Sequence, residues 1–375
     1  MSGRPRRVVH VVRAMNRAGG ETWLMHVLRS LDPRLLQMDF LVHTGIPSAY
    51  DHEIIGRGSH LMQCTVSHRS PAYGLAVRSL LRQFGPYDVV HSHVHYFSGF
   101  LLGLARRLEI PVRIAHSHLD TSQEDIMAGW LRRRYLQCAR AGIGRHATHW
   151  LAASQEAGRA LFGQTWEVDP RSQVLHCGID LQPFRHVEAR NEVRASLQIG
   201  ADEVVVGHVG RFDPQKNHPF IVEIAAEACR REPRLRLLLV GEGPQRPLIE
   251  ERLRALGIAS RATFLGSRAD VPRLLMAMDG FLFPSLYEGL GLALVEAQAA
   301  GLPCLISDCI PAEADLSPEL VHRLPLSVGA ATWAERLVAV MGGRLVHRAS
   351  ALASVENSDF NIQKSLEGLY ALYRA

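Results

Sequence analysis

The sequence predicts an α/β protein made of two doubly wound, parallel-sheet domains that face a central cleft. Short apolar runs alternate with longer amphipathic stretches, a pattern typical of parallel strands covered by helices. The chain has 375 residues, enough for two domains of roughly 150 to 200 residues each. The strand pattern lapses between His176 and Glu203 and then resumes, which indicates where the first domain ends.

The apolar runs predict a complete set of strands in each half of the chain. We expect them at residues 7–14, 38–44, 88–93, 112–118 and 149–154, and then at 204–211, 235–243, 262–267, 280–285 and 303–308. Helical spacing of apolar residues is clearest at residues 20–31, 98–109, 218–232, 245–257 and 290–301. We therefore assign residues 1–187 and 188–358 to two Rossmann-like domains. Residues 359–375 form an amphipathic helix expected to pack back across the domain boundary.

The composition is that of an ordinary globular protein, with 47% apolar and 21% charged residues. No apolar run approaches the ~18 residues of a membrane span. The N-terminus is basic but has no apolar h-region of the kind found in signal peptides before Arg13, so no signal peptide is expected. The six cysteines are scattered without a C-x-x-C pair, which disfavours disulfides and a structural zinc site. These features favour the cytoplasm.

Positive charge is concentrated in the N-terminal half. Residues 1–187 hold 22 Arg and no Lys against 14 acidic residues, a net +8, and the remainder carries −3, so the total is +5. Residues 129–142 place Arg132, Arg133 and Arg134 beside Trp130 and Tyr135. On a helix this segment would dock on an anionic membrane, near a lipid-linked acceptor. An amphipathic helix with a basic outer face is the alternative. Nothing indicates a nucleic-acid partner.

Two glycine-containing loops are candidates for binding phosphate. Gly19 and Gly20 stand between the first strand and its helix, where backbone N–H groups can approach an anion. A plain tight turn is an equal alternative. In the second half, Gly210 ends a strand, Arg211 follows it, and Lys216 precedes the next helix. These two cations would clamp a diphosphate, Arg211 as a planar fork and Lys216 as a point charge. Two solvated loop cations are the alternative.

A third candidate is the stretch "SLYEGLGLALVEAQAAGLPC", residues 285–304. Glu288 lies in a glycine-bracketed turn, and Glu296 lies eight residues later within a helix. Gly289 and Gly291 leave the first N–H groups of that helix uncovered by side chains, so they are free to bind a phosphate.

Motifs along nearly the whole chain resemble those of a known enzyme family. "GRFDPQKN", "VGEGPQRPLIE", "FLGSRADVPRLL", "FLFPSLYEGLGLALVEAQAAGLPCL" and "HCGIDLQPF" resemble the retaining glycosyltransferases of the GT-B fold (family 4, "glycosyl transferases group 1"). Their E-x7-E motif is matched by Glu288 and Glu296. The N-terminal pieces "MNRAGGETWLMHVLRSLD", "YDHEIIGRGS", "DVVHSHVHYFSG" and "VRIAHSHLD" are similar to the branch that builds capsular and exopolysaccharides.

The resemblance implies a retaining hexosyltransferase of cell-surface polysaccharide biosynthesis. The donor would be a nucleotide sugar, most often a UDP-sugar, and the acceptor a glycan or a lipid-linked sugar. The first domain would bind the acceptor and the second the donor. The cations and exposed amides could stabilise a diphosphate leaving group without a metal, so no metal or other cofactor is expected.

The resemblance also implies roles for single residues. Glu288 would meet the donor sugar and Glu296 the ribose hydroxyls. The base would lie against backbone near Leu265. The other donor-binding residues that it implies are Gly19, Gly20, Gly210, Arg211, Lys216, Gly289, Leu290 and Gly291. A histidine near the donor sugar would be His116, with His118 as the second choice because a slip in the alignment exchanges them.

Three other functions fit parts of the sequence. The histidines at strand ends (His91, His93, His95, His116 and His118) match a metal-dependent hydrolase pattern. A sugar-nucleotide epimerase could use the same architecture and needs no acceptor. A nucleotide-sugar-binding subunit would need no catalytic residues. The two-domain pattern, the cation pair and the glutamates together favour the glycosyltransferase.

Overall fold

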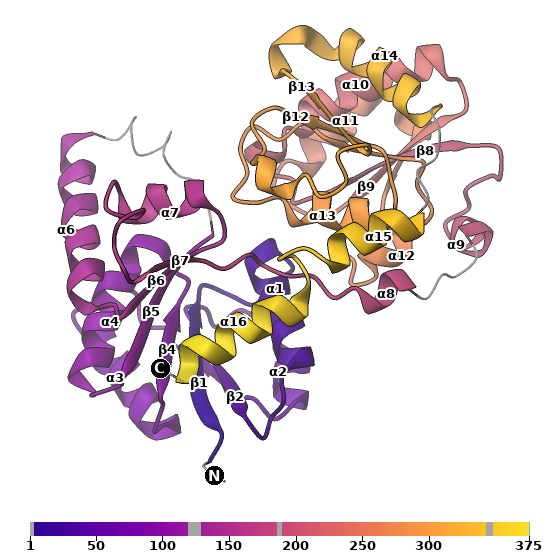
Figure 1. Ribbon diagram of the computed structural model, residues 1–375. Coiled ribbons are helices and arrows are strands. Elements are labelled where there is room, and N and C mark those ends of the chain that lie inside the picture. The colour runs from indigo at the N-terminus through magenta and orange to yellow at the C-terminus, as the bar shows by residue number, and fades with distance from the viewer. Residues whose placement is uncertain (1–3, 119–128, 186–189, 343–347, 375) are drawn as a thin grey trace. The chain divides into compact units, whose positions relative to one another are not determined.

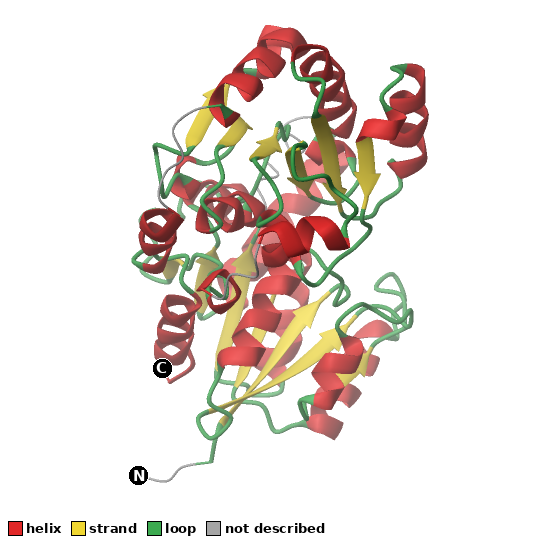
Figure 2. Cartoon of the chain, turned by 90° about the vertical axis from the view of Figure 1, so that its right-hand side faces the viewer, coloured by secondary structure: helices red, strands yellow, loops and turns green. Residues whose placement is uncertain are grey.

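The protein, seen in a computed structural model, divides into two compact units (Figure 1). The structure describes residues 4–118, 129–185, 190–342 and 348–374. One unit comprises Met1–Gly178 together with Ile362–Ala375, and the other comprises Ile179–Asn361. In each unit a parallel sheet lies between helices, and the strands are drawn in yellow in Figure 2. The predicted pair of doubly wound, parallel-sheet α/β domains is confirmed.

The N-terminal unit is built on a seven-stranded parallel sheet in the order β3-β2-β1-β4-β5-β6-β7. Its strands are β1 (Arg6–Val12), β2 (Leu36–Val42), β3 (Leu61–Gln63), β4 (Val89–Ser92), β5 (Val112–Ser117), β6 (His149–Ala152) and β7 (Ser172–Val174). Its helices are α1 (Gly19–Ser30), α2 (Asp51–Gly56), α3 (Tyr73–Phe84), α4 (Ser98–Arg107), α6 (Trp130–His146), α7 (Gln155–Phe162) and α16 (Ile362–Arg374), with a 3₁₀ turn η1 (His95–Phe97).

The two faces of this sheet differ in chemistry. Val9, Val11, Val90 and Ala115 point into an aliphatic and aromatic core shared with α3, α4 and α6. Because side chains alternate along a strand, the residues between them point to the other face. That face carries histidines and is covered by α1 and α16.

Helix α16 is the last helix of the chain, yet it packs on the N-terminal unit, against α1 (Figure 1). The Tyr370 hydroxyl accepts a hydrogen bond from the Asp32 amide at 2.8 Å. The Tyr373 hydroxyl bonds Nδ1 of His91 at 2.7 Å. Ser365 Oγ accepts from the Gly178 amide at 2.9 Å. The helix predicted at 359–375 is therefore present, and these contacts assign it to the first unit.

The C-terminal unit has a six-stranded parallel sheet in the order β10-β9-β8-β11-β12-β13. Its strands are β8 (Val204–Val209), β9 (Leu235–Val240), β10 (Ala262–Phe264), β11 (Gly280–Phe283), β12 (Cys304–Ser307) and β13 (Val321–Leu324). Its helices are α8 (Gln182–Arg185), α9 (Arg190–Ser196), α10 (His218–Arg231), α11 (Arg246–Ala255), α12 (Val271–Leu275), α13 (Leu292–Ala299), α14 (Gly329–Met341) and α15 (Arg348–Glu356). Its 3₁₀ turns are η2 (Pro214–Lys216), η3 (Ala259–Arg261), η4 (Ala312–Ala314) and η5 (Leu326–Val328).

Counted within each unit, both sheets have the strand order 3-2-1-4-5-6 of a doubly wound fold, and the N-terminal sheet adds a seventh strand after the sixth. In such sheets ligands bind at the carboxyl ends of the strands, where the order reverses. This switch point lies between β8 and β11 in the C-terminal unit and between β1 and β4 in the N-terminal unit. A ligand-binding site is therefore expected at the loops that follow these strands.

Every predicted strand and every predicted helix is present, with ends that differ by a few residues. Strands β3, β7 and β13 were not predicted. Each is only three or four residues long, lies at an edge of its sheet and is partly exposed, so it has no continuous apolar run.

The predicted domain boundary between residues 187 and 188 lies outside the described residues, and the two units divide earlier, after Gly178. Helix α8 belongs to the second unit because its side chains and carbonyls bond there. Arg185 forms an ion pair with Glu356, and the Phe184 carbonyl accepts from Arg348.

No helix in the described ranges is both long and apolar enough to cross a bilayer. All six cysteines are free thiols.

Gly241 supports a close contact between the loops that follow β8 and β9. Its φ of +141° is accessible mainly to glycine. A Cβ on Gly241 would lie 2.0 Å from the carbonyl oxygen of Gly210.

We expect Gly241→Ala to reduce the free energy of unfolding by at least about 2 kcal/mol, from backbone strain and overpacking. Urea unfolding followed by circular dichroism measures this change.

Gly257→Ala is the matched control for this variant. Gly257 also has a positive φ, of +73°, but a Cβ there would meet nothing within 4 Å. It is expected to lose only about 1–2 kcal/mol. Equal losses in the two variants would show that the contact with Gly210 is unimportant.

Candidate active site

Two loops at the switch point of the C-terminal unit are joined by hydrogen bonds. One follows β8 and the other follows β11. Asn217 Nδ2 donates to the Pro284 carbonyl at 3.1 Å. Gln215 accepts from the Leu286 amide through its carbonyl at 2.8 Å, and its side chain donates to the Tyr287 carbonyl at 3.0 Å. These bonds hold the two loops as one framework.

Lys216 and Glu288 form an ion pair within this framework. Lys216 Nζ lies 2.6 Å from Oε1 of Glu288, a residue that is only 6% exposed. Gln215 Nε2 donates to Oε2 of Glu288 at 3.2 Å. The ammonium group also lies 4.8 Å from the centre of the Phe283 ring. The sequence analysis predicted both charged residues but missed Gln215, which lies within the quoted motif "GRFDPQKN".

Gly210 makes room for the lysine side chain. A Cβ on Gly210 would lie 3.1 Å from Cγ and 3.2 Å from Cδ of Lys216. A glycine at the end of β8 therefore lets the lysine stem cross the backbone and reach Glu288.

Helix α13 begins beside Glu288 with an uncapped N-terminus. Gly291 is its N-cap, at φ 84° and ψ 51°, a left-handed conformation that glycine adopts readily. No side chain caps the helix and no acidic residue lies in its first turn. Gly289 and Leu290 form the turn that leads into it and are buried. The first N–H groups of α13 thus provide donors and partial positive charge for an anion.

Arg211 is not in contact with this pair. Its guanidinium lies 2.7 Å from Asp213, and 62% of the side chain is exposed. An ion pair this exposed contributes little to stability, so the arginine is free to exchange Asp213 for another anion. The predicted clamp is therefore assembled at Lys216 only.

Leu265 lies at the carboxyl end of the edge strand β10. Its amide donates to the Leu239 carbonyl at 2.9 Å, and the Gly266 carbonyl accepts from the Gly241 amide at 2.9 Å. These bonds join the end of β10 to the end of β9, where the predicted base-binding backbone lies.

Glu296 lies in the second turn of α13 and is half-buried. Burial raises its pKa to about 7. Among the residues that the structure describes, none forms a hydrogen bond or ion pair with its carboxyl group. A half-buried carboxyl without a partner is suited to accept hydrogen bonds from hydroxyl groups of a ligand.

In the N-terminal unit, the candidate loop follows β1. Gly19 and Gly20 form the first residues of α1 rather than a loop before it, and Ala18 at the N-cap offers no side-chain bond. A Cβ on Gly20 would lie 3.7 Å from the ring of His118. His118 is therefore in contact with the start of α1.

The two candidate histidines differ in position. His116 lies within β5 and is fully buried, and its Nδ1 lies 3.1 Å from Nε2 of His91. His118 follows the strand and is partly exposed. Both side chains point to the same side of the segment, as expected. The geometry favours His118, the second choice from the sequence, for a place beside a ligand.

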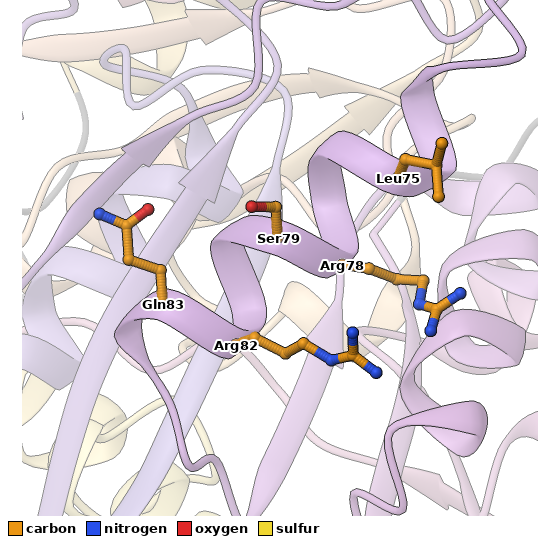
Figure 3. Close-up of a pocket in the computed structure, with 5 residues that line it drawn as sticks. All are labelled: Leu75, Arg78, Ser79, Arg82 and Gln83. Atoms are coloured by element: carbon orange, nitrogen blue, oxygen red, sulfur yellow. The ribbon is translucent and has the colours of Figure 1, made fainter.

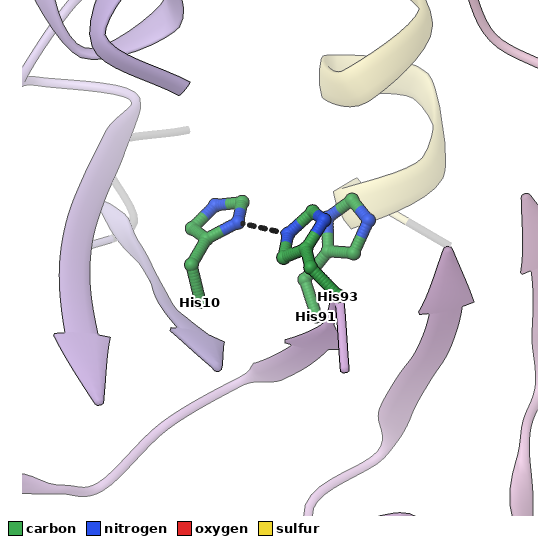
Figure 4. Close-up of side chains that lie close together, drawn as sticks. All are labelled: His10, His91 and His93. Carbon is green, nitrogen blue, oxygen red and sulfur yellow. Dashed lines mark hydrogen bonds between the residues drawn. The ribbon is translucent and has the colours of Figure 1, made fainter. Parts of the chain in front are cut away.

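Five histidines lie together on the face of this sheet covered by α1 and α16: His10, His91, His93, His116 and His118. Figure 4 draws three of them, with the bond of 2.9 Å between His10 Nδ1 and His93 Nε2. Burial, and then neighbouring imidazoles, lower the pKa of each, to about 3 for His10 and about 4 for His118. The rings are therefore neutral near pH 7.

The histidines in and just after β4 and β5 were predicted from the sequence, but His10 in β1 was not. The alternation Val9-His10-Val11 could have revealed it, because side chains alternate along a strand and His10 must point to the face opposite the valines.

A surface hollow of about 460 Å³ lies on α3 (Figure 3). Its lining residues all come from that one helix: Leu75, Arg78, Ser79, Arg82 and Gln83. It contains none of the predicted site residues, so we do not assign a substrate to it.

Comparison with known proteins gives family matches to both halves of the chain. Residues 17–183 match the family described as Glycosyltransferase Family 4, and residues 203–340 match Glycosyl transferases group 1. The chain is 37% identical over 376 residues to the protein named putative glycosyltransferase EpsF of Bacillus subtilis (strain 168), covering 100% of this chain and 97% of the relative. It is 32% identical over 304 residues to D-inositol 3-phosphate glycosyltransferase of Nocardia farcinica, covering 78% and 67%.

Solved structures show the same two-domain fold. Anabaena Alr3699/HepE in complex with UDP and glucose superposes with a TM-score of 0.81 at 18% identity, covering 98% of this chain and 99% of that one. WaaG, a glycosyltransferase involved in lipopolysaccharide biosynthesis, superposes with a TM-score of 0.69 at 19% identity, covering 98% and 97%. These likenesses identify the fold as GT-B.

The raised pKa of Glu296 predicts that this residue destabilises the protein at alkaline pH. Its ordinary pKa is 4.5 and its folded-state pKa is about 7, so the folded state binds the proton more tightly. Its contribution to the free energy of unfolding is greatest below pH 4.5 and falls as pH rises to 7. We expect Glu296→Gln to be more stable than the original protein at pH 8 by about 1–3 kcal/mol, and the difference to shrink towards pH 5. Urea unfolding at both pH values measures this.

Glu335→Gln, at an exposed position on α14, is the control and should change stability little at either pH. A Glu296→Gln protein that is less stable at pH 8 would contradict the assigned environment.

Proposed function

Because the chain belongs to the family 4 and group 1 glycosyltransferases, we propose that it is a retaining enzyme that uses a UDP-sugar. The acceptor is a glycan or a lipid-linked sugar of cell-surface polysaccharide biosynthesis. The UDP complexes of HepE support the choice of donor. The N-terminal motifs, similar to those of the capsular and exopolysaccharide branch, support the choice of pathway.

The observation that carries this proposal is the pairing of Lys216 with Glu288 beside the uncapped N-terminus of α13. A donor diphosphate would replace Glu288 as the partner of Lys216 and accept hydrogen bonds from the first amides of the helix. Glu288, released from the lysine, would accept hydrogen bonds from hydroxyls of the donor sugar.

These donors act most strongly in the transition state. As the bond between the sugar C1 and the diphosphate oxygen breaks, negative charge grows on the diphosphate and positive charge on the sugar. Fixed donors aimed at the diphosphate stabilise this state more than the bound substrate. Each charge-assisted hydrogen bond contributes roughly 1.5–3 kcal/mol, so three or four substitute for a metal ion. We therefore propose that transfer needs no metal.

Retention is proposed through attack on the face that the diphosphate leaves. A bond forms between C1 and the acceptor oxygen, and the acceptor proton passes to the departing diphosphate oxygen. His118 is placed at the start of α1 and is neutral, so it can hydrogen-bond a sugar hydroxyl without acting as the base.

Glu296 is proposed to bind the ribose of the donor. A carboxylate accepts two hydroxyl hydrogen bonds, as the ribose diol requires. The absence of a partner for Glu296 among the described residues supports this role. The base would lie against the backbone at Leu265 and Gly266.

Family membership disfavours the other functions that the sequence left open. An epimerase would interconvert nucleotide sugars without an acceptor, and a binding subunit would release no UDP. The free state of all six cysteines supports a reducing compartment, and we propose the cytoplasm.

Lys216→Ala should abolish transfer, because it removes the point charge from the leaving diphosphate. A panel of nucleotide sugars in a thermal-shift assay first identifies the donor. UDP release and product formation are then measured with EDTA present, and NMR of the product gives the anomeric configuration. We expect turnover to fall by at least about 10²-fold. Glu288→Gln should lose activity similarly while keeping the shape of the buried side chain.

Lys364→Ala is the matched control, since Lys364 is the other lysine of the chain and is exposed on α16. It should retain full activity. Normal turnover by Lys216→Ala, a requirement for metal, or a product of inverted configuration would each contradict the proposal.

The start of α6 supports peripheral contact with a membrane. Trp130, Leu131 and Tyr135 are 72%, 66% and 53% exposed. The three arginines between Leu131 and Tyr135 are exposed as well. Large apolar side chains beside clustered arginines suit the interface of an anionic bilayer. We propose that this helix end brings the enzyme to its lipid-linked acceptor.

Replacing Arg132, Arg133 and Arg134 together by Gln should weaken binding to anionic vesicles, by up to about 1 kcal/mol for each charge. Co-sedimentation with phosphatidylglycerol vesicles at low and high salt measures this binding. The control replaces Arg82, Arg106 and Arg107, also exposed, and removes the same charge. Equal binding by both triple variants would exclude α6 as the docking surface.

A further inference from the structure

The histidine face of the N-terminal sheet contains a group of side chains that the transfer mechanism does not use in full. His93, His116 and His118 come from the ends of the neighbouring strands β4 and β5. One ring nitrogen from each lies within 4.8 Å of the others. His10, His91 and His93 form a second such group, shown in Figure 4, and share His93 with the first.

Each ring of the first group has one nitrogen held by a neighbour outside it. Nδ1 of His116 lies 3.1 Å from Nε2 of His91. Nε2 of His93 lies 2.9 Å from Nδ1 of His10. Nδ1 of His118 lies 3.7 Å from the Cys177 sulfur. If each of these nitrogens carries the proton, the three opposite nitrogens are left with lone pairs.

The three opposite nitrogens have no other protein partner among the described residues. Nε2 of His116 is buried without a hydrogen bond, in a residue that is fully buried. Nδ1 of His93 and Nε2 of His118 lie 2.8 Å apart, and with the protons on their other ring nitrogens the two lone pairs would repel each other. A metal ion would relieve both conditions, because it accepts three lone pairs that the protein leaves close together.

We propose that His93, His116 and His118 bind a divalent transition-metal ion of the Zn²⁺ class. Three imidazole ligands with an open fourth position are a known zinc arrangement, with Zn–N distances of about 2.0–2.1 Å. Nitrogens on a tetrahedral ion lie about 3.3 Å apart, so the pair now at 2.8 Å would separate slightly. Three imidazole nitrogens do not suit Mg²⁺ or Ca²⁺, because these ions take oxygen ligands.

The neighbours already occupy the positions that orient metal-bound histidines. In metal sites the second ring nitrogen usually donates to a fixed acceptor, which sets the tautomer and the ring angle. His10 and His91 are placed to accept from His93 and His116. His91 can accept because its own Nδ1 bonds the Tyr373 hydroxyl at 2.7 Å. The indole of Trp23 packs 5.3 Å from the His116 ring and 5.8 Å from the His118 ring, covering the group.

This site is independent of the donor-binding groups of the C-terminal unit. The ion takes no part in the proposed transfer, which needs no metal. While it is bound, Nε2 of His118 is not available to the sugar hydroxyl proposed above, so the ion and the sugar would compete for this side chain. Metal binding is therefore measured without a nucleotide sugar. Failure of the metal site therefore leaves the proposed function intact, and failure of transfer leaves the metal site intact.

Titration of the metal-free full chain with Co²⁺ tests the site. Tetrahedral Co²⁺ gives intense visible absorption, and Zn²⁺ should displace it. We expect saturable binding of at least one equivalent, and at least 100-fold weaker binding by His93→Ala and by His118→Ala. His10→Ala, which removes an orienting neighbour, should weaken binding by about 10–100-fold.

His52→Ala, at an exposed position on α2, is the control and should bind as the original chain does. His118 is partly exposed, so its replacement tests the site even if the His93 variant does not fold. The proposal is overturned if the original chain shows no saturable uptake of Co²⁺ or Zn²⁺. It is equally overturned if His118→Ala binds with unchanged affinity.

Discussion

The geometry of the candidate site in the C-terminal unit depends on one buried ion pair, Lys216 with Glu288. A buried charge is tolerated only when an opposite charge or several hydrogen-bond donors lie beside it. Here the pair joins the loops after β8 and β11, and Gln215 and Asn217 add bonds between the same loops. The pair therefore fixes the geometry at the switch point before any ligand arrives. The donor diphosphate proposed above would then replace Glu288 as the partner of Lys216 without reorganising the backbone.

Glu296, the second glutamate of the motif, is also removed from solvent but has no partner for its charge among the described residues. Its carboxyl group is half-buried, and this burial raises its pKa because the charged form is poorly solvated. The two glutamates are eight residues apart and share one helix and its preceding turn, yet one is paired and the other is not. Side chains whose environment lowers the stability of the fold are common at ligand-binding sites. The protein thus accepts a local loss of stability at a position that a bound diol would satisfy.

Much of this structure follows from local sequence pattern, and the remainder follows from contacts across long sequence distances. The long apolar strands are readable because burial on both faces requires continuous apolar runs. The edge strands β3, β7 and β13 are not, because partial exposure removes that requirement. Lys216 and Glu288 are 72 residues apart, and only the adjacency of β8 and β11 brings them together. Arg211 was predicted beside Lys216, but an exposed side chain takes the nearest anion, which is Asp213.

The packing of α16 on the N-terminal unit has a consequence for biosynthesis. The sheet of that unit is complete once β7 has been made, but α16, one of the two helices that cover its histidine face, follows the whole second unit in the sequence. Domains usually fold in order as they leave the ribosome. In this protein the histidine face of the first domain is covered by α1 alone until the second domain has been made. Helix α16, with Tyr370 and Tyr373, can dock only after the second domain has been made. A chain that stops before Ile362 would therefore have a complete second domain and a first domain without this helix.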